Sequence, residues 1–268
     1  MSIVVEAASV RTAPPPVRGL RLSSRQQSLL GVIALLLLLP FAVRMDPRNF
    51  LAFTDLAIWR FLAEGVVIVL VVSAVAIVLS LPIAVALALG RLSTKLALRV
   101  PSIALVEGIR AIPLLLLIFY VFLTMPRDVS TFVGREALAL TLALMVYTAA
   151  INAETLRAGI IALDRGQMEA ARSLGLSHWN ALRYVVLPQA FRNTLPPLLA
   201  QFTTLVKDTS LGLAIGMVEL LSRGRIIYQG ERNPMETLYV VGLLYFAVNF
   251  ILEQVSLATQ RGDSGQRQ

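Results

Sequence analysis

Between Glu64 and Arg91 the chain has 26 consecutive uncharged residues, 65–90, with the sequence GVVIVLVVSAVAIVLSLPIAVALALG. A helix needs about 20 apolar residues to cross the hydrocarbon core of a bilayer. The composition of all 268 residues agrees, because 57% are hydrophobic and only 15% are charged, against about 25% charged in soluble domains. An ordinary soluble globular domain is therefore excluded, and we expect an all-α integral membrane protein surrounded by lipid.

Five further apolar stretches predict a polytopic transmembrane helix bundle of about six spans. They lie between Arg25 and Arg44, at residues 100–126, between Glu136 and Glu154, at residues 193–218, and between Glu236 and Glu253. If the N-terminus is cytoplasmic, 14 basic residues fall on inner segments and 8 on outer ones. Since basic residues favour the cytoplasmic side, both termini are predicted to be cytoplasmic. The net charge of +8 is thereby explained without nucleic acid binding.

The two ends of the chain differ from its apolar middle. Residues 1–27 contain Pro14, Pro15 and Pro16 with scattered arginines and are predicted to be a disordered basic tail. Residues 28–63 are predicted to form an extra span followed by a short helix at the outer interface, from Phe53 to Ala63. A cleavable signal peptide is the alternative for the first apolar run. Residues 259–268 are predicted to be a cytoplasmic tail.

The longest polar interruption, from about Arg157 to Phe191, has helical signals of its own. Asp164 and Gln167 resemble a capping box, and Gly175 is typical of a left-handed helix stop. Ser177 can cap a second helix, which Pro188 is expected to end. Two short helices hinged at a glycine predict a compact knob that can dock into a groove of a partner. A solvated connector is the alternative.

The same segment carries a family pattern. Glu169-Ala170-Ala171 is followed after three residues by Gly175, and after nine more by Val185-Val186-Leu187-Pro188. This spacing resembles the EAA motif of the membrane subunits of ATP-binding-cassette (ABC) importers, with Val185 where the pattern usually has isoleucine. Flanking blocks resemble the polar amino acid permease branch, and glutamate/aspartate permeases closely; they are RAIP (110–113), ETLRAGI (154–160), RGQ (165–167), LPQAFR (187–192) and KDTSL (207–211).

The resemblance covers about residues 64–258 and implies the type I ABC importer transmembrane-domain fold, with a coupling loop at about 161–188. Such permeases pair with a second copy or a paralogue, receive substrate from an extracytoplasmic solute-binding protein, and seat each loop in a cytoplasmic ATP-binding subunit dimer. Glu169 would form an ion pair there, while Ala170, Ala171 and Gly175 would permit close helix approach. The implied coupling residues are Gly166, Glu169, Ala170, Ala171, Gly175, Leu187 and Pro188.

The chain lacks the sequence features of an energy-converting enzyme. A phosphate-binding P-loop needs glycine followed by lysine and then serine or threonine, but Lys95 follows Thr94 and Lys207 follows Val206. With one histidine, His178, and no cysteine, a metal centre built on these residues is not expected. We therefore expect a non-enzymatic subunit without a cofactor of its own, and ATP and Mg²⁺ bound in the partner ATPase.

Charges inside the predicted spans indicate a substrate path. Lys207 and Asp208 lie near the middle of the fifth stretch, where each charge costs roughly 2.5–3.5 kcal/mol. They are therefore expected to face a polar interior beside Thr209 and Ser210, in a helix that Pro196-Pro197 and Gly212 make irregular. Glu107 with Arg110, and Glu154 with Arg157, are three residues apart and can pair, so structural ties between helices are the alternative for them. Gly212 and Gly216 form a small-residue pair, expected either at a dimer seam or in packing within the subunit.

Together these features predict a multi-pass permease subunit of an ATP-driven importer in the bacterial inner membrane. The expected substrate is a polar amino acid such as glutamate, aspartate or glutamine. Two alternatives remain at this level: a permease of the same family for another solute, and a passive channel or membrane scaffold.

Overall fold

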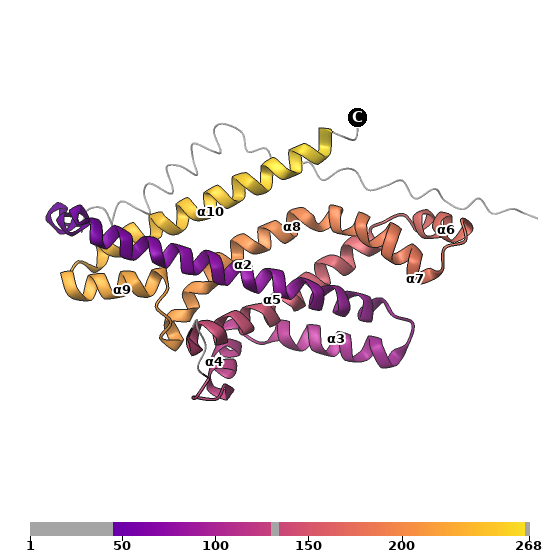
Figure 1. Cartoon of the computed structure of the whole chain (residues 1–268), viewed down its shortest axis with the longest axis horizontal. Helices are drawn as coiled ribbons and strands as arrows, with labels where there is room; N and C mark the ends of the chain where they lie inside the picture. Colours follow the sequence, from indigo (N-terminus) through magenta and orange to yellow (C-terminus); the bar gives the residue numbers. More distant parts are fainter. Residues whose placement is uncertain (1–44, 130–133, 266–268) are drawn as a thin grey trace, which may run out of the picture. The chain divides into compact units, whose positions relative to one another are not determined.

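The computed structural model describes residues 45–129 and 134–265, and every regular element in these ranges is helical. Figure 1 shows α6 and α7 at one end of the described unit and α9 at the other. The elements are η1 (Pro47–Thr54), α2 (Leu56–Leu92), α3 (Leu96–Ala111), α4 (Leu114–Thr124), α5 (Arg135–Ile161), α6 (Arg165–Ser173), α7 (His178–Ala181), η2 (Leu182–Val186), α8 (Leu187–Asp208), η3 (Thr209–Ile215), α9 (Leu220–Glu231) and α10 (Pro234–Gly265). The tail and first apolar run predicted before Arg44 lie outside the described residues.

Three helices in the described ranges are long and apolar enough to cross a membrane: α2, α5 and residues 234–255 of α10. The third predicted stretch is not one straight span, because α3 and α4 meet at an angle of 104°. The bend follows from Pro113, which has no amide hydrogen and disfavours helical backbone at the residue before it. As one broken span the pair would be the fourth. α8 is too polar to join them, since it carries Arg192, Gln201 and Lys207.

The longest helix, α2, begins where the Asp55 side chain accepts a hydrogen bond from the backbone N–H of Ala57 at 2.8 Å. The short outer helix predicted from Phe53 to Ala63 is therefore wrong. Residues 47–54 form the 3₁₀ helix η1, and residues 56–63 are the first turns of α2. Without a glycine or proline between residues 56 and 64, nothing in the local sequence ends a helix there.

η1 and the start of α2 pack in the same compact unit as the rest of the described residues. Glu236, in the first turn of α10, accepts hydrogen bonds from the Asp46 backbone N–H at 2.8 Å and from the Asn49 side chain at 3.2 Å. The Asn233 side chain donates a hydrogen bond to the Asn49 carbonyl at 3.0 Å. These bonds hold residues 46–49 against the start of α10.

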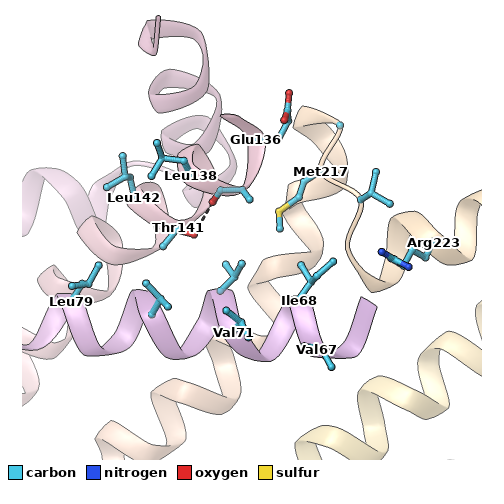
Figure 2. Close-up of a pocket in the computed structure, with 15 residues that line it drawn as sticks. Val67, Ile68, Val71, Leu79, Glu136, Leu138, Thr141, Leu142, Met217 and Arg223 are labelled. Carbon is cyan, nitrogen blue, oxygen red and sulfur yellow. Dashed lines mark hydrogen bonds between the residues drawn. The ribbon is translucent and has the colours of Figure 1, made fainter. Parts of the chain in front are cut away.

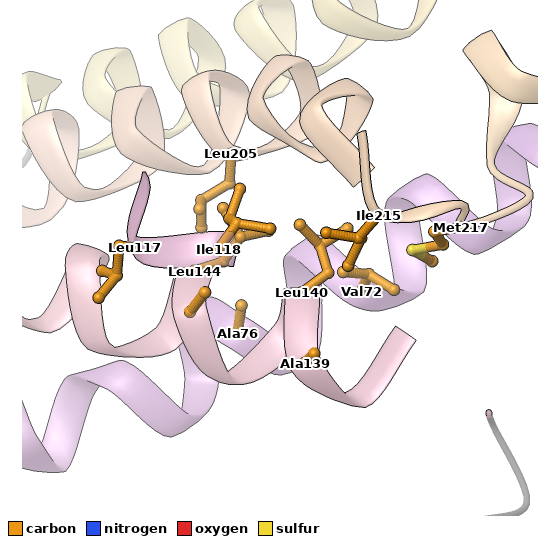
Figure 3. Close-up of a cluster of buried hydrophobic side chains, with 11 residues drawn as sticks. Val72, Ala76, Leu117, Ile118, Ala139, Leu140, Leu144, Leu205, Ile215 and Met217 are labelled. Carbon is orange, nitrogen blue, oxygen red and sulfur yellow. The ribbon is translucent and has the colours of Figure 1, made fainter. Parts of the chain in front are cut away.

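The main apolar core lies where α2, α4, α5, α8 and η3 meet (Figure 3). Ile118, Leu140 and Leu205 are fully buried there. α2 approaches α5 through small residues, since Ala76 on α2 and Ala139 on α5 are also fully buried. Small residues are what close helix packing in membranes requires, because lipid supplies no hydrophobic force between helices.

The second helix of the polar segment does not end at Pro188, contrary to the sequence prediction. α7 passes through one π-turn, η2, and continues as α8, in which Pro188 occupies the first turn. In the π-turn the Leu187 N–H bonds to the Leu182 carbonyl, five residues earlier. A proline in a first turn needs no amide hydrogen there, so the helix continues.

Candidate functional site

α6 and α7 form a two-helix knob after the C-terminal end of α5 (Figure 1). Its predicted caps are confirmed: Asp164 accepts from the Gly166 N–H at 2.7 Å, and Ser177 accepts from the Asn180 N–H at 3.3 Å. Gly175 adopts a φ of 88°, which only glycine enters without strain. The Gln167 side chain was expected to complete the capping box. It instead accepts a hydrogen bond from the Gln189 side chain at 3.1 Å and so ties α6 to α8.

The coupling residues predicted on this knob divide by exposure. Gly166, Glu169 and Ala170 are exposed and Ala171 is buried; in the first turn of α8, Pro188 is exposed and Leu187 is half-buried. Glu169 forms no ion pair within the part of the chain that the structure describes. A Cβ on Gly175 would meet nothing within 4 Å, so within this chain its role is conformational and not close helix approach.

Large apolar side chains are also exposed on the knob and in the π-turn η2 that follows it. Leu174 is 85% exposed, Tyr184 63% and Trp179 58%. Exposed apolar groups outside the spans, together with an exposed acidic group, are typical of a protein-binding surface. The knob therefore has the composition of a docking surface.

The intramembrane charges on α2, α3 and α5 meet in one ion cluster. Arg91 Nη2 lies 2.9 Å from Glu107 and 3.3 Å from Glu154. Arg157 binds both oxygens of Glu154, with its Nε donating at 3.0 Å. Arg110 lies 3.7 Å from Glu107. Arg91 thus ties Glu107 on α3 to Glu154 on α5, whereas the Glu107–Arg110 and Glu154–Arg157 contacts each lie within one helix.

Arg91 is the member that sequence reasoning missed as a site residue. It counted only as a basic residue at the inner end of a span, yet its side chain is 12% exposed and bridges two acidic residues. No local sequence signal marked it, because its partners Glu107 and Glu154 lie on later helices and each has an arginine three residues away. The cluster joins the ends of α2 and α3 to α5, the helix that leads directly into the knob.

A shallow hollow of about 510 Å³ opens beside Glu154, between α5 and the first half of α8. Gly159 lets the two helices approach closely here, because a Cβ at this position would collide with the Thr194 methyl group. Asn193 and Pro197 complete the α8 side of the hollow. Glu154 therefore lines an open hollow whose surface is mainly apolar.

The second predicted group of path residues lies further along α8, where the helix changes form. α8 ends at Asp208 and continues as the 3₁₀ helix η3, which stops at Gly216 with a φ of 83°. Lys207 is exposed and Asp208 is half-buried. The predicted irregularity is confirmed, but its break lies after Asp208, and Pro196 and Pro197 lie inside a continuous helix.

The hydroxyl groups of this segment serve the backbone. Thr209 donates to the Val206 carbonyl at 2.8 Å and Ser210 donates to the Lys207 carbonyl at 2.7 Å. Lys207 is ten residues beyond Pro197, which corresponds to about 15 Å along the helix axis. The predicted path residues therefore form two groups at different positions along the helices, and no ion pair among the described residues joins them.

Gly212 packs within the subunit. A Cβ there would lie 2.9 Å from the Leu140 side chain on α5 and 3.3 Å from Met217. Gly216 instead supplies the positive φ that ends η3. The structure therefore favours packing within the subunit for Gly212.

A buried acidic group next to this break was missed as well. Glu219 is fully buried at the start of α9, where it accepts from the Leu221 and Ser222 N–H groups, both at 2.8 Å. The Tyr245 hydroxyl of α10 donates to it at 2.9 Å. Glu219 therefore fastens α9 to α10.

Within residues 45–129 and 134–265, no group of three or more potential metal-ligating side chains lies together.

Comparison with known families gives the class of protein. Residues 80–259 match the family model described as binding-protein-dependent transport system inner membrane component. This match covers most of the chain, so the chain belongs to that family of membrane transport subunits.

Two relatives of this chain are named as amino acid permeases. The chain is 41% identical over 161 residues to the probable glutamine ABC transporter permease of Bacillus subtilis, covering 59% of this chain and 71% of the relative. It is 30% identical over 195 residues to the glutamate/aspartate import permease of Escherichia coli O157:H7, covering 70% and 87%.

Solved structures agree on the fold. A crystal structure of an amino acid ABC transporter with histidines matches with a TM-score of 0.70 and 26% identity, covering 81% of this chain and 98% of the other. An inward-facing methionine ABC transporter matches with a TM-score of 0.57 at 22% identity, covering 75% and 95%.

Proposed function

We propose that this chain is the permease subunit of an ATP-driven importer for a polar amino acid such as glutamine, glutamate or aspartate. The observation that carries the proposal is the exposed knob of α6 and α7, with Glu169 and Leu174 both exposed, in a member of this transport family. Relatives named as glutamine and glutamate/aspartate permeases support the substrate class.

The knob docks on a separate ATPase. Glu169 supplies a charge that an arginine or lysine in the ATPase groove can pair with. Leu174 and Trp179 supply apolar contact area, and Ala170 leaves room for a close helix approach. Gly175 sets the angle between the two helices. ATP with Mg²⁺ is bound by the ATPase dimer, and this chain performs no hydrolysis itself.

Substrate passes the two groups of polar residues in turn. Lys207 and Asp208, with Thr209 and Ser210, offer opposite charges to an amino acid at the α8–η3 break. Glu154 beside its hollow, with Glu107 and Arg110, offers charges nearer the knob. A zwitterionic or anionic amino acid can exchange the water around its charges for these groups.

The complete importer contains further subunits. Two permeases, either two copies of this chain or this chain with a paralogue, enclose the path. A solute-binding protein delivers the amino acid from outside, at the end of the unit that carries α9. The protein spans the bacterial inner membrane several times, with both termini and the knob in the cytoplasm.

The test measures amino-acid-stimulated ATP hydrolysis in proteoliposomes containing this permease with its ATPase and binding protein. Glu169→Lys reverses the charge on the knob and is expected to abolish stimulation. Glu231→Lys, an exposed acid on α9 at the other end, is the matched control and should retain it. Equal stimulation in both variants would remove Glu169 from the coupling role.

The passive channel and scaffold alternatives give different results. A channel equilibrates the amino acid without ATP, and a scaffold retains ATPase binding while tolerating Lys207→Met and Asp208→Asn. The permease proposal requires ATP-dependent uptake that both substitutions reduce.

A further inference from the structure

A buried carboxylate fastens the loop after η3 to α10. Glu219 is fully buried, and each of its oxygens accepts from a backbone N–H at 2.8 Å, Oε1 from Ser222 and Oε2 from Leu221. The Tyr245 hydroxyl donates to Oε2 at 2.9 Å. No lysine or arginine pairs with Glu219 within the part of the chain that the structure describes. Hydrogen bonds therefore compensate the burial of this acidic group.

Further hydrogen bonds close the loop between η3 and α9. The Ser222 hydroxyl donates to the Met217 carbonyl at 2.5 Å, and the Met217 N–H donates to the Gly212 carbonyl at 3.0 Å. The Met217 side chain lines the hollow between α2 and α5 (Figure 2). The C-terminal end of η3 is therefore tied to the start of α9, where Glu219 lies.

Tyr245 also reaches the N-terminal end of η3. Its hydroxyl contacts the side chain of Thr209, the first residue of η3. Thr209 is fully buried and directly follows Asp208. One tyrosine on α10 thus touches the start of η3 and, through Glu219, the loop at its end.

This support matters because η3 is long for its type. A 3₁₀ helix of more than about four residues is uncommon, since its hydrogen-bond geometry is poor, whereas η3 (Thr209–Ile215) has 7 residues. Rewound as α-helix, these 7 residues would be about 3.5 Å shorter. Because Asp208 directly precedes η3, such a change would move Lys207 and Asp208 relative to α9 and α10.

We propose that Tyr245 and Glu219 are positioning residues of the substrate path. They hold η3 in the form that presents Lys207 and Asp208 to the amino acid. Glu219 is fully buried, and the Tyr245 hydroxyl is bonded to it, so both residues act through η3. The inference rests on the proposed function, because it takes Lys207 and Asp208 as path residues.

The test compares two tyrosines of α10 in proteoliposomes that contain the assembled transporter and enclose ATP. Tyr245→Phe removes the hydroxyl between Glu219 and Thr209, and the initial rate of amino acid uptake should fall about tenfold, equivalent to about 1.4 kcal/mol. Tyr239→Phe is the matched control and should transport as wild type does. Tyr239 is 44% exposed, and its ring, which the substitution keeps, packs edge-on against Phe50.

A labelling measurement separates positioning from general loosening of the fold. The chain contains no cysteine, so Lys207→Cys and Lys95→Cys each introduce a single thiol at an exposed position, the first just before η3 and the second just before α3. When Tyr245→Phe is added, the rate of maleimide labelling should change several-fold at position 207 and stay constant at position 95. An equal change at both positions, or no change at position 207, would overturn the proposal.

A double-mutant cycle tests whether the two residues act together. In Glu219→Gln the amide nitrogen faces a backbone N–H in either orientation, so uptake should fall as it does in Tyr245→Phe. The double variant should be little slower than either single variant, and additive losses would contradict a joint role. If the wild type fails to accumulate amino acid, the proposed function is refuted, while the labelling rates still decide whether Tyr245 fixes η3.

Discussion

Replacing Arg91 with methionine is the sharpest perturbation of the ion cluster that joins α2, α3 and α5. Methionine preserves most of the apolar stem and removes the guanidinium group. Arg91 is 12% exposed and bridges Glu107 at 2.9 Å and Glu154 at 3.3 Å. Both carboxylates lose a partner at once, so the free energy of unfolding should fall.

The two contacts contribute unequally. The Glu107 side chain is 53% exposed, so solvent screens that pair to at most about 1 kcal/mol. The Glu154 side chain is 28% exposed. Losing one partner of a buried pair costs about 3–5 kcal/mol when nothing else compensates. Because Arg157 still holds Glu154, we expect about 1–2 kcal/mol for this contact, and about 1–3 kcal/mol in total.

The assay is reversible unfolding in mixed micelles, followed by circular dichroism, for double-mutant cycles built on Arg91→Met, Glu154→Gln and Glu107→Gln. The coupling energy between Arg91 and Glu154 should exceed that between Arg91 and Glu107. A larger coupling to Glu107, or none to either residue, would refute the burial argument.

Three further predictions concern helix packing, the knob and the substrate path. Gly159→Val should lower the unfolding free energy by about 1–3 kcal/mol, because the valine side chain would collide with Thr194 on α8. Gly230→Val is the control and should leave the unfolding free energy unchanged, because the space around Gly230 is open. Equal losses in both variants would contradict the close packing at Gly159. Gly175→Ala places a Cβ at a φ of 88° at a cost of about 1–2 kcal/mol; amino-acid-stimulated ATP hydrolysis should fall while membrane insertion is kept, and unchanged hydrolysis would show that the turn does not set coupling. Asp208→Asn and Lys207→Met should each lower uptake at least about tenfold, as an altered charge contact worth about 1.4 kcal/mol implies; full uptake in both would remove this pair from the path.

Local sequence signals predicted local structure well. The uncharged run 65–90 lies within α2, and Gly175 and Ser177 end and begin helices as their residue types require. The prediction that Pro188 ends a helix was wrong, because a proline can also occupy the first turn of a helix. Here the π-turn η2 directly precedes that first turn. Such a choice depends on how α7 and α8 pack, which no local pattern encodes.

The sequence identified most of the charged residues of the candidate site, but it did not show which of them form ion pairs across helices. Glu107, Arg110, Glu154 and Arg157 were visible as charges inside apolar runs. Arg91, the common partner of Glu107 and Glu154, lies at the end of another helix, and adjacency between helix ends is a tertiary property. Glu219 was hidden for the same reason, since its buried contact with Tyr245 joins residues 26 positions apart. The roles of the knob and path residues in coupling and transport stay predictions.

The most direct test of an ATP-driven amino acid importer is accumulation of labelled glutamine or glutamate in proteoliposomes that contain the assembled transporter and enclose ATP. An ATP-driven importer should raise the internal amino acid concentration well above the external one when ATP is enclosed. No accumulation should occur when a non-hydrolysable analogue replaces ATP. Equilibration to the external concentration, with or without ATP, would contradict ATP-driven import and identify a passive channel.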